Sequence, residues 1–119
     1  MISQFLALLF IHWVADFILQ THWQAQNKSK NNEALARHVG VYTLTLATAS
    51  WFVFGTSYDK WAAFWALNGL LHFCTDYFTS KWTSKLYAKQ DWHNFFVIVG
   101  LDQLIHQFTL ALTMIWLIK

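Results

Sequence analysis

Three of the five aspartates in this chain have a histidine four residues away. The pairs are His12 with Asp16, His72 with Asp76, and His106 with Asp102. A spacing of four places both side chains of a pair on one face of a helix, with Cβ atoms about 5–6 Å apart. Imidazole and carboxylate groups at that separation can bind one metal ion or two adjacent ions. The spacing therefore predicts a metal site built from helices.

A fourth histidine, His38, lies at a similar depth in another apolar segment and completes the candidate set. The predicted metal ligands are His12, Asp16, His38, His72, Asp76, Asp102 and His106. Such a set suffices for one or two divalent ions, with zinc favoured and manganese or iron as alternatives. Any member that binds no metal could act as general base, so the catalytic residue stays open. Gln20 and Asn68 extend two of these rows and are expected to hydrogen-bond to the ligands.

The competing interpretation of the pairs is structural. Each His–Asp pair could form an intrahelical hydrogen bond that makes polar side chains tolerable inside an apolar helix bundle. That explanation would suffice for any single pair. The three pairs and His38 are, however, all estimated to lie in one layer about 5–20 Å from the same end of the helices. Their convergence favours the metal site.

The elements that must position these residues are long and apolar. Apolar residues make up 56% of the chain and charged residues 12%, whereas soluble globular domains have about 25% charged residues. A membrane-spanning helix needs about 20 apolar residues. Four segments approach that length: residues 3–21, 36–57, 61–83 and 93–117. The sequence predicts one all-α domain over residues 1–119, an integral membrane four-helix bundle of two hairpins with the His/Asp layer in its cytoplasmic half.

The basic residues indicate the orientation of such a bundle. They lie mainly in the first and third connections, as Lys28, Lys30, Arg37, Lys81, Lys85 and Lys89. By the positive-inside rule both connections face the cytoplasm, which leaves both termini on the outer side of the membrane. Because these residues are not massed on one face, no nucleic-acid partner is expected.

The motif His12-x-x-x-Asp16-Phe17-x-x-Gln20, followed by Trp23, Lys28 and His38 and by a later His72-x-x-x-Asp76, resembles a known family. It is similar to small phage and bacterial membrane proteins called domain of unknown function 3307. The resemblance covers most of the chain and implies a protein of the bacterial inner membrane, often phage-encoded, with no established reaction. A more distant similarity is to membrane-bound metal-dependent hydrolases, which also place rows of His and Asp in apolar helices.

Three functional hypotheses follow. The leading one is an intramembrane metal-dependent hydrolase that cleaves a phosphoester or acyl bond of a lipid or lipid-linked substrate near the cytoplasmic leaflet. Lys28 and Lys81, at the expected mouth of the site, could attract a phosphate or could only set the topology. The alternatives are a divalent cation or proton transporter, and a non-enzymatic phage envelope protein that binds a host membrane protein. Membrane lipid is the expected partner, with a homo-oligomer or a host membrane protein as further candidates.

Overall fold

The computed structural model describes residues 1–118 of the chain. These residues form helices joined by short connections, and none of them lies in a β-strand. In chain order the helices are α1 (Ile2–Trp13), η1 (Val14–Ile18), α2 (His22–Asn27), α3 (Asn32–Phe54), α4 (Tyr58–Ala88), α5 (Trp92–Thr113) and η2 (Met114–Ile118), where η marks a π-helix. The all-α prediction is confirmed.

The connections are more ordered than the sequence suggests. The short helix α2 occupies the polar segment between the first two long helices, where Thr21 and Gln24 form a capping box. In it, Thr21 Oγ1 accepts a hydrogen bond from the Gln24 backbone at 3.2 Å and Gln24 Oε1 accepts one from the Thr21 backbone at 3.0 Å. Helix α4 extends to Ala88, so Lys81 and Lys85 lie on the helix rather than in the connection to α5.

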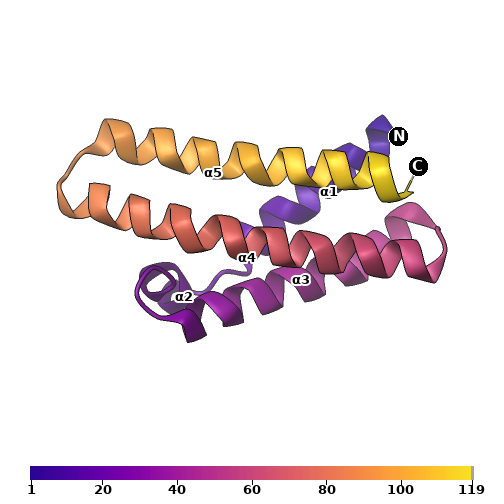
Figure 1. Cartoon of the computed structure of the whole chain (residues 1–119), viewed down its shortest axis with the longest axis horizontal. Coiled ribbons are helices and arrows are strands. Elements are labelled where there is room, and N and C mark those ends of the chain that lie inside the picture. The colour runs from indigo at the N-terminus through magenta and orange to yellow at the C-terminus, as the bar shows by residue number, and fades with distance from the viewer. Residues whose placement is uncertain (119) are drawn as a thin grey trace.

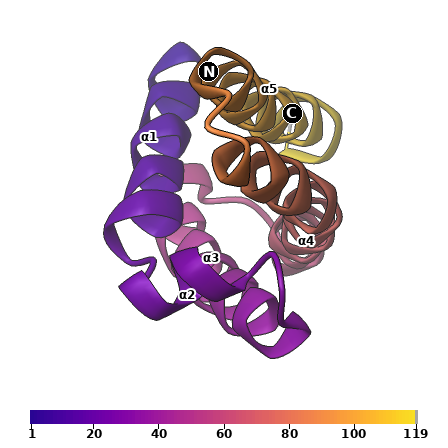
Figure 2. The same cartoon turned by 90° about the vertical axis from the view of Figure 1, so that its left-hand side faces the viewer.

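The four longer helices lie side by side around one interior (Figure 2). Helix α1 packs against α3 and α5, and α4 packs against the same two helices. Both termini lie at one end of the molecule, whereas α2 and the turn between α4 and α5 lie at the other end (Figure 1). The two basic connections therefore share one end, as the prediction of two hairpins requires.

The interior changes character along its length. An apolar cluster lies mainly toward the termini and consists of Leu8, Ala15, Tyr42, Leu46, Phe64, Leu110 and Met114. Toward α2 the buried residues include six ionisable ones: His12, Asp16, His38, His72, Asp76 and His106. Burying such groups is costly unless they are paired or bind a metal. The candidate site therefore lies in the half of the bundle nearer α2.

Large apolar side chains cover much of the exterior. Phe52, Ile2 and Trp116 are 82%, 79% and 79% exposed. Their exposure is costly in water, since soluble monomers rarely expose large contiguous apolar patches.

The prediction of four membrane spans is not confirmed. Among residues 1–118, only the continuous helix Trp92–Ile118 is long and apolar enough to cross a membrane, and the apolar helix Ile2–Ile18 is shorter. Helices α3 and α4 have sufficient length, but polar residues such as His38, Asn68 and Asp76 interrupt their apolar sequence. Two of these three residues, His38 and Asp76, are predicted metal ligands.

Candidate metal centre

The His/Asp layer, called the polar layer below, contains residues from every long helix. Its predicted ligands are His12 on α1, Asp16 on η1, His38 on α3, His72 and Asp76 on α4, and Asp102 and His106 on α5. The π-helical turn around Asp16 is closed by a 2.9 Å hydrogen bond from the Leu19 N–H to the Val14 carbonyl. Such turns are rare and frequently occur at functional sites. All these ligands except Asp102 are buried, and Asp102 is half-buried.

Four of the side chains, those of Asp16, His38, His72 and Asp76, could bind one ion together. His38 Nε2 lies 3.0 Å from Asp16 Oδ1, 3.2 Å from His72 Nε2 and 3.3 Å from Asp76 Oδ2. His72 Nε2 lies 3.4 Å from Asp16 Oδ1 and 3.6 Å from Asp76 Oδ2. Ligands bound tetrahedrally at about 2.0–2.2 Å are separated from one another by roughly 3.3–3.6 Å. Five of the six separations among the four atoms therefore lie close to those of a tetrahedral zinc site, and all six are within 4.8 Å.

A second ligand group adjoins the first and shares Asp16 with it. It consists of Asp16, Asp102 and His106. His106 Nε2 lies 3.4 Å from Asp102 Oδ1 and 3.1 Å from Asp76 Oδ1. Asp76 thus presents Oδ2 to the first group and Oδ1 to His106. Carboxylates placed in this way can bridge two ions, which in two-metal sites are about 3.5–4 Å apart.

The shortest contacts between histidine and aspartate join different helices. His38 to Asp16 is 3.0 Å and His106 to Asp76 is 3.1 Å. The pairs with a spacing of four are longer, at 3.7 Å for His12 and Asp16, 3.6 Å for His72 and Asp76, and 3.4 Å for His106 and Asp102. The spacing therefore identified residues that meet, but the closest contacts run between helices rather than along them.

His12 differs from the other six predicted ligands because it belongs to neither ligand group. Its Nε2 hydrogen-bonds to Gln103 Oε1 at 2.9 Å, and its Nδ1 lies 3.1 Å from the Tyr42 hydroxyl. Gln103 Nε2 in turn donates to Asp16 Oδ2 at 2.9 Å and to Asp102 Oδ2 at 3.1 Å. His12 thus holds an amide that orients two carboxylates of the ligand groups.

Three further residues of the layer were not predicted: Tyr42, Thr79 and Gln103. Thr79 Oγ1 donates to Asp102 Oδ1 at 2.6 Å, and the Tyr42 ring stacks on His72 with centroids 3.8 Å apart. Each of the three lies three or four residues from a predicted ligand on its own helix. The helical spacing that identified the His–Asp pairs could therefore have identified them as well.

Gln20 and Asn68 do not hydrogen-bond to the predicted ligands within the part of the chain that the structure describes. Asn68 Nδ2 donates to the Phe64 carbonyl and to Thr113 Oγ1, both at 2.8 Å. It lies one turn nearer the termini than His72, where Thr113 is the polar side chain within its reach. Gln20 Oε1 is buried and has no hydrogen-bond partner among residues 1–118.

The two lysines expected at the mouth of the site occupy different environments. Lys28 Nζ donates to Asp76 Oδ2 at 2.9 Å, whereas Lys81 Nζ lies 3.6 Å from the centre of the Tyr77 ring. Lys28 belongs to the connection between α2 and α3, outside the long helices. Burial lowers the pKa of Lys28, but the negative charges of Asp76 and Asp16 raise it further, to above its usual value. The ammonium group therefore stays charged beside the ligand groups.

Comparison with known proteins adds a family but no function. A family model described as "Protein of unknown function (DUF3307)" matches residues 4–119, which include all of the predicted ligands. No curated protein and no solved structure gives a match, and the similarity to membrane-bound metal-dependent hydrolases is not shown by these comparisons. The match covers nearly the whole chain, and the chain therefore belongs to the DUF3307 family of proteins of unknown function.

Proposed function

We propose that this protein is a membrane-embedded, metal-dependent hydrolase whose His/Asp layer holds one or two divalent ions. The observation that carries the proposal is the set of distances of 3.0–3.6 Å among Asp16, His38, His72 and Asp76, which fits a tetrahedral ligand shell. Imidazole and carboxylate ligands suit zinc, with manganese or iron as alternatives. The one cysteine, Cys74, is exposed and belongs to neither ligand group.

The contacts of the Nε2 atoms of His38 and His72 favour a cation over a hydrogen-bond network. In a satisfied network each imidazole nitrogen has a partner of its own. Here the Nε2 atoms of His38 and His72 face each other at 3.2 Å and face the same two carboxylates. The Nδ1 atom of each is buried without a partner among the described residues. A cation among the Nε2 lone pairs and the carboxylates would remove the conflict between the two Nε2 atoms and would place the proton of each ring on Nδ1. Each Nδ1–H would then need an acceptor other than residues 1–118, such as water.

Ions held in this layer would supply Lewis acidity for the hydrolysis of an ester. In that reaction the oxygen of water bonds to the phosphorus or acyl carbon, the bond to the alcohol oxygen breaks, and a proton of water ends on the alcohol. Asp102 is the best placed carboxylate to accept that proton first. Its side chain is 15% exposed, compared with 5% for Asp16 and 1% for Asp76.

A lipid or lipid-linked ester is the substrate class that fits the exterior of the molecule. The exposed apolar side chains and the helix Trp92–Ile118 favour a lipid environment. The polar layer lies toward the end that carries α2 and most of the basic residues, and by the positive-inside rule this end would face the cytoplasm. A headgroup of the cytoplasmic leaflet would then lie near the ligand groups.

Elemental analysis of the detergent-purified protein by plasma mass spectrometry tests the metal. We expect about one to two ions per chain, and loss of metal in His72→Ala and Asp76→Asn variants that stay helical by circular dichroism. Metal-loaded protein should then cleave lipid phosphoesters or acyl esters presented in micelles. Substoichiometric metal that is unchanged in the variants under metal-replete conditions would contradict the proposal. Weakly held metal with flux into proteoliposomes would instead favour cation transport.

A further inference from the structure

Two adjoining cavities lead from the surface beside α2 to the ligand groups. The inner cavity, of about 220 Å³, is bordered by Asp16 and Asp102. The outer cavity, of about 610 Å³, is bordered by residues 25–30 and by the end of α4. The residues that line both cavities are Lys28, Ser80, Thr83 and Phe95. A ligand that enters beside α2 would therefore pass these residues before it reaches the carboxylates.

The walls of the two cavities contain polar groups that have no hydrogen-bond partner among residues 1–118. Ser80 is 7% exposed, and its hydroxyl has no hydrogen-bond partner among residues 1–118. The Oε1 atom of Gln20, a residue that lines the inner cavity, is also buried without a hydrogen-bond partner among these residues. Buried polar atoms are nearly always hydrogen-bonded. Their position on the cavity wall indicates that a polar ligand or water completes their hydrogen bonds.

Lys28 provides the positive charge where the two cavities adjoin. Its ammonium group lies 2.9 Å from Asp76 Oδ2. That oxygen is also the one that faces His38 and His72 in the tetrahedral group. A divalent ion bound to it would repel the ammonium at such short range. Because the lysine stem is flexible and borders both cavities, its ammonium can turn toward them when the ion is present.

We propose that Lys28 and Ser80 form a phosphate subsite beside the metal centre, so that the substrate is a phosphoester rather than an acyl ester. The inference rests on the proposed function and narrows it. Lys28 and the Ser80 hydroxyl would donate hydrogen bonds to the phosphate oxygens. Thr83 Oγ1 already donates to the Thr79 and Ser80 carbonyls, at 3.0 and 3.1 Å, and contributes only to the wall. The phosphorus would then lie between this subsite and the carboxylates of Asp16 and Asp102, which border the same inner cavity.

The remaining wall of the inner cavity is apolar and includes Phe17, Phe95 and Val99. It could accommodate the acyl chains of a lipid phosphate or the body of a soluble phosphoester. These two sources share the phosphate chemistry that the subsite would recognise. They differ in how much the apolar wall would contribute to binding.

The test is isothermal titration calorimetry of the full-length, metal-loaded protein with inorganic phosphate. Lys28→Met should weaken phosphate binding by about tenfold or more and Ser80→Ala by about threefold, since a charge-assisted hydrogen bond is stronger than a neutral one. Lys81→Met is the matched control, because Lys81 lies over the Tyr77 ring and lines neither cavity. Its phosphate affinity should equal that of the wild type. Metal content, measured in parallel, should be unchanged in all three variants.

Each outcome bears on the two proposals separately. Retained metal with no phosphate binding, or with equal binding in Lys28→Met and the wild type, would overturn the subsite and leave the metal centre standing. Absence of metal from the wild type would overturn both proposals. Competition then identifies the source of the phosphate. If phosphatidic acid in micelles displaces inorganic phosphate at lower concentration than glycerol 3-phosphate does, the subsite accepts a lipid headgroup; equal displacement would assign it to soluble phosphoesters.

Discussion

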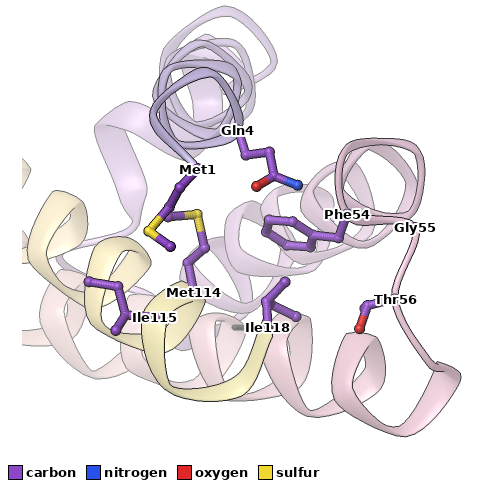
Figure 3. Close-up of a pocket in the computed structure, with 8 residues that line it drawn as sticks. All are labelled: Met1, Gln4, Phe54, Gly55, Thr56, Met114, Ile115 and Ile118. Atoms are coloured by element: carbon purple, nitrogen blue, oxygen red, sulfur yellow. The ribbon is translucent and has the colours of Figure 1, made fainter.

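The cavity near the termini and the cavity near the ligand groups are lined by different chemistry. The first, of about 280 Å³, is bordered by Met1, Gln4, Phe54, Met114 and their neighbours, and its lining includes no charged side chain (Figure 3). The second, of about 220 Å³, is bordered by Asp16, Asp102 and Lys28. The two cavities are therefore similar in volume but differ in the charge of the side chains that line them.

The two halves of the interior differ in how they contribute to stability. The apolar cluster around Leu46 and Phe64 can stabilise the fold by burial alone. The layer around Asp16 and Asp76 buries charges, which stabilise a fold only when they are paired or bind a cation. A bundle that needed nothing but stability would gain by filling this layer with apolar residues. The proposed metal centre accounts for these buried charges, and the following predictions test it.

The largest effect on stability should come from the apolar half. Phe64 is fully buried and packs edge-on against Phe54, with ring centroids 4.9 Å apart. Phe64→Ala should lower the free energy of unfolding by about 3–5 kcal/mol because it leaves a cavity, while the metal content of the folded protein stays the same. Chemical unfolding in detergent measures the first quantity. The matched control is Phe52→Ala, at a residue 82% exposed, which should change stability by less than about 0.5 kcal/mol. Loss of metal without loss of stability in Phe64→Ala would show that the two halves are not separable.

The largest effect on metal binding should come from Asp76. Its carboxylate lies within 3.3 Å of His38, His106 and Lys28, and a neutral amide is a poor metal ligand. Asp76→Asn should weaken metal binding at least about 100-fold, more than the loss of a residue that only supports a ligand. Competition with a chromophoric chelator gives the affinity. Asp91→Asn is the control, because Asp91 caps α5 at the surface and asparagine caps equally well. Equal losses in both variants would point to a nonspecific effect of charge.

The contact between α3 and α4 connects the two halves and can be tested at Gly69. A Cβ atom at Gly69 would lie 2.5 Å from Thr43 Oγ1 and 2.9 Å from Thr43 Cγ2, whereas one at Gly100 would meet nothing within 4 Å. Rotation of Thr43 always leaves one of these two positions occupied. Both Gly→Ala changes gain the same helix propensity of about 1 kcal/mol. Gly69→Ala should therefore be less stable than Gly100→Ala by about 1–3 kcal/mol, the cost of overpacking.

Thermal unfolding of the two glycine variants measures that difference, and metal affinity adds a second readout. Gly69 lies one turn before His72 on α4, so a wider spacing of α3 and α4 would move His72 away from His38. Metal binding should weaken in Gly69→Ala and stay unchanged in Gly100→Ala. Equal stability of the two variants would show that the helices separate without cost at this point.

Local patterns account for what the sequence could predict. The spacing of four on apolar segments identified the residues of the polar layer, because helical periodicity brings such pairs to one face regardless of the tertiary structure. The all-α class followed from the length of the four apolar segments. The segment boundaries followed from charge and missed the extension of α4, since the last turns of that helix are polar and exposed.

Tertiary geometry accounts for what the sequence could not predict. The short contact of His38 with Asp16 joins residues 22 positions apart, and the contact of Lys28 with Asp76 joins residues 48 positions apart. No local spacing encodes either. Lys28 and Lys81 looked equivalent as residues beside the site, yet only the fold of the connection through α2 brings Lys28 to the carboxylates. The separation of His12 from the two ligand groups is of the same kind.

The smallest effect should therefore come from His12, which the sequence places among the ligands and the structure places against Gln103 and Tyr42. If His12 only holds Gln103 in place, His12→Asn should weaken metal binding by about tenfold, the usual cost of losing a residue that orients a ligand. His38→Asn is the comparison, because His38 belongs to the tetrahedral group and its loss should cost at least about tenfold more. Spectroscopy of the cobalt-substituted protein separates the two roles, since a lost nitrogen ligand changes the d–d bands and a displaced hydrogen bond hardly does. Equal losses of metal affinity and equal spectral changes in His12→Asn and His38→Asn would show that His12 is itself a metal ligand.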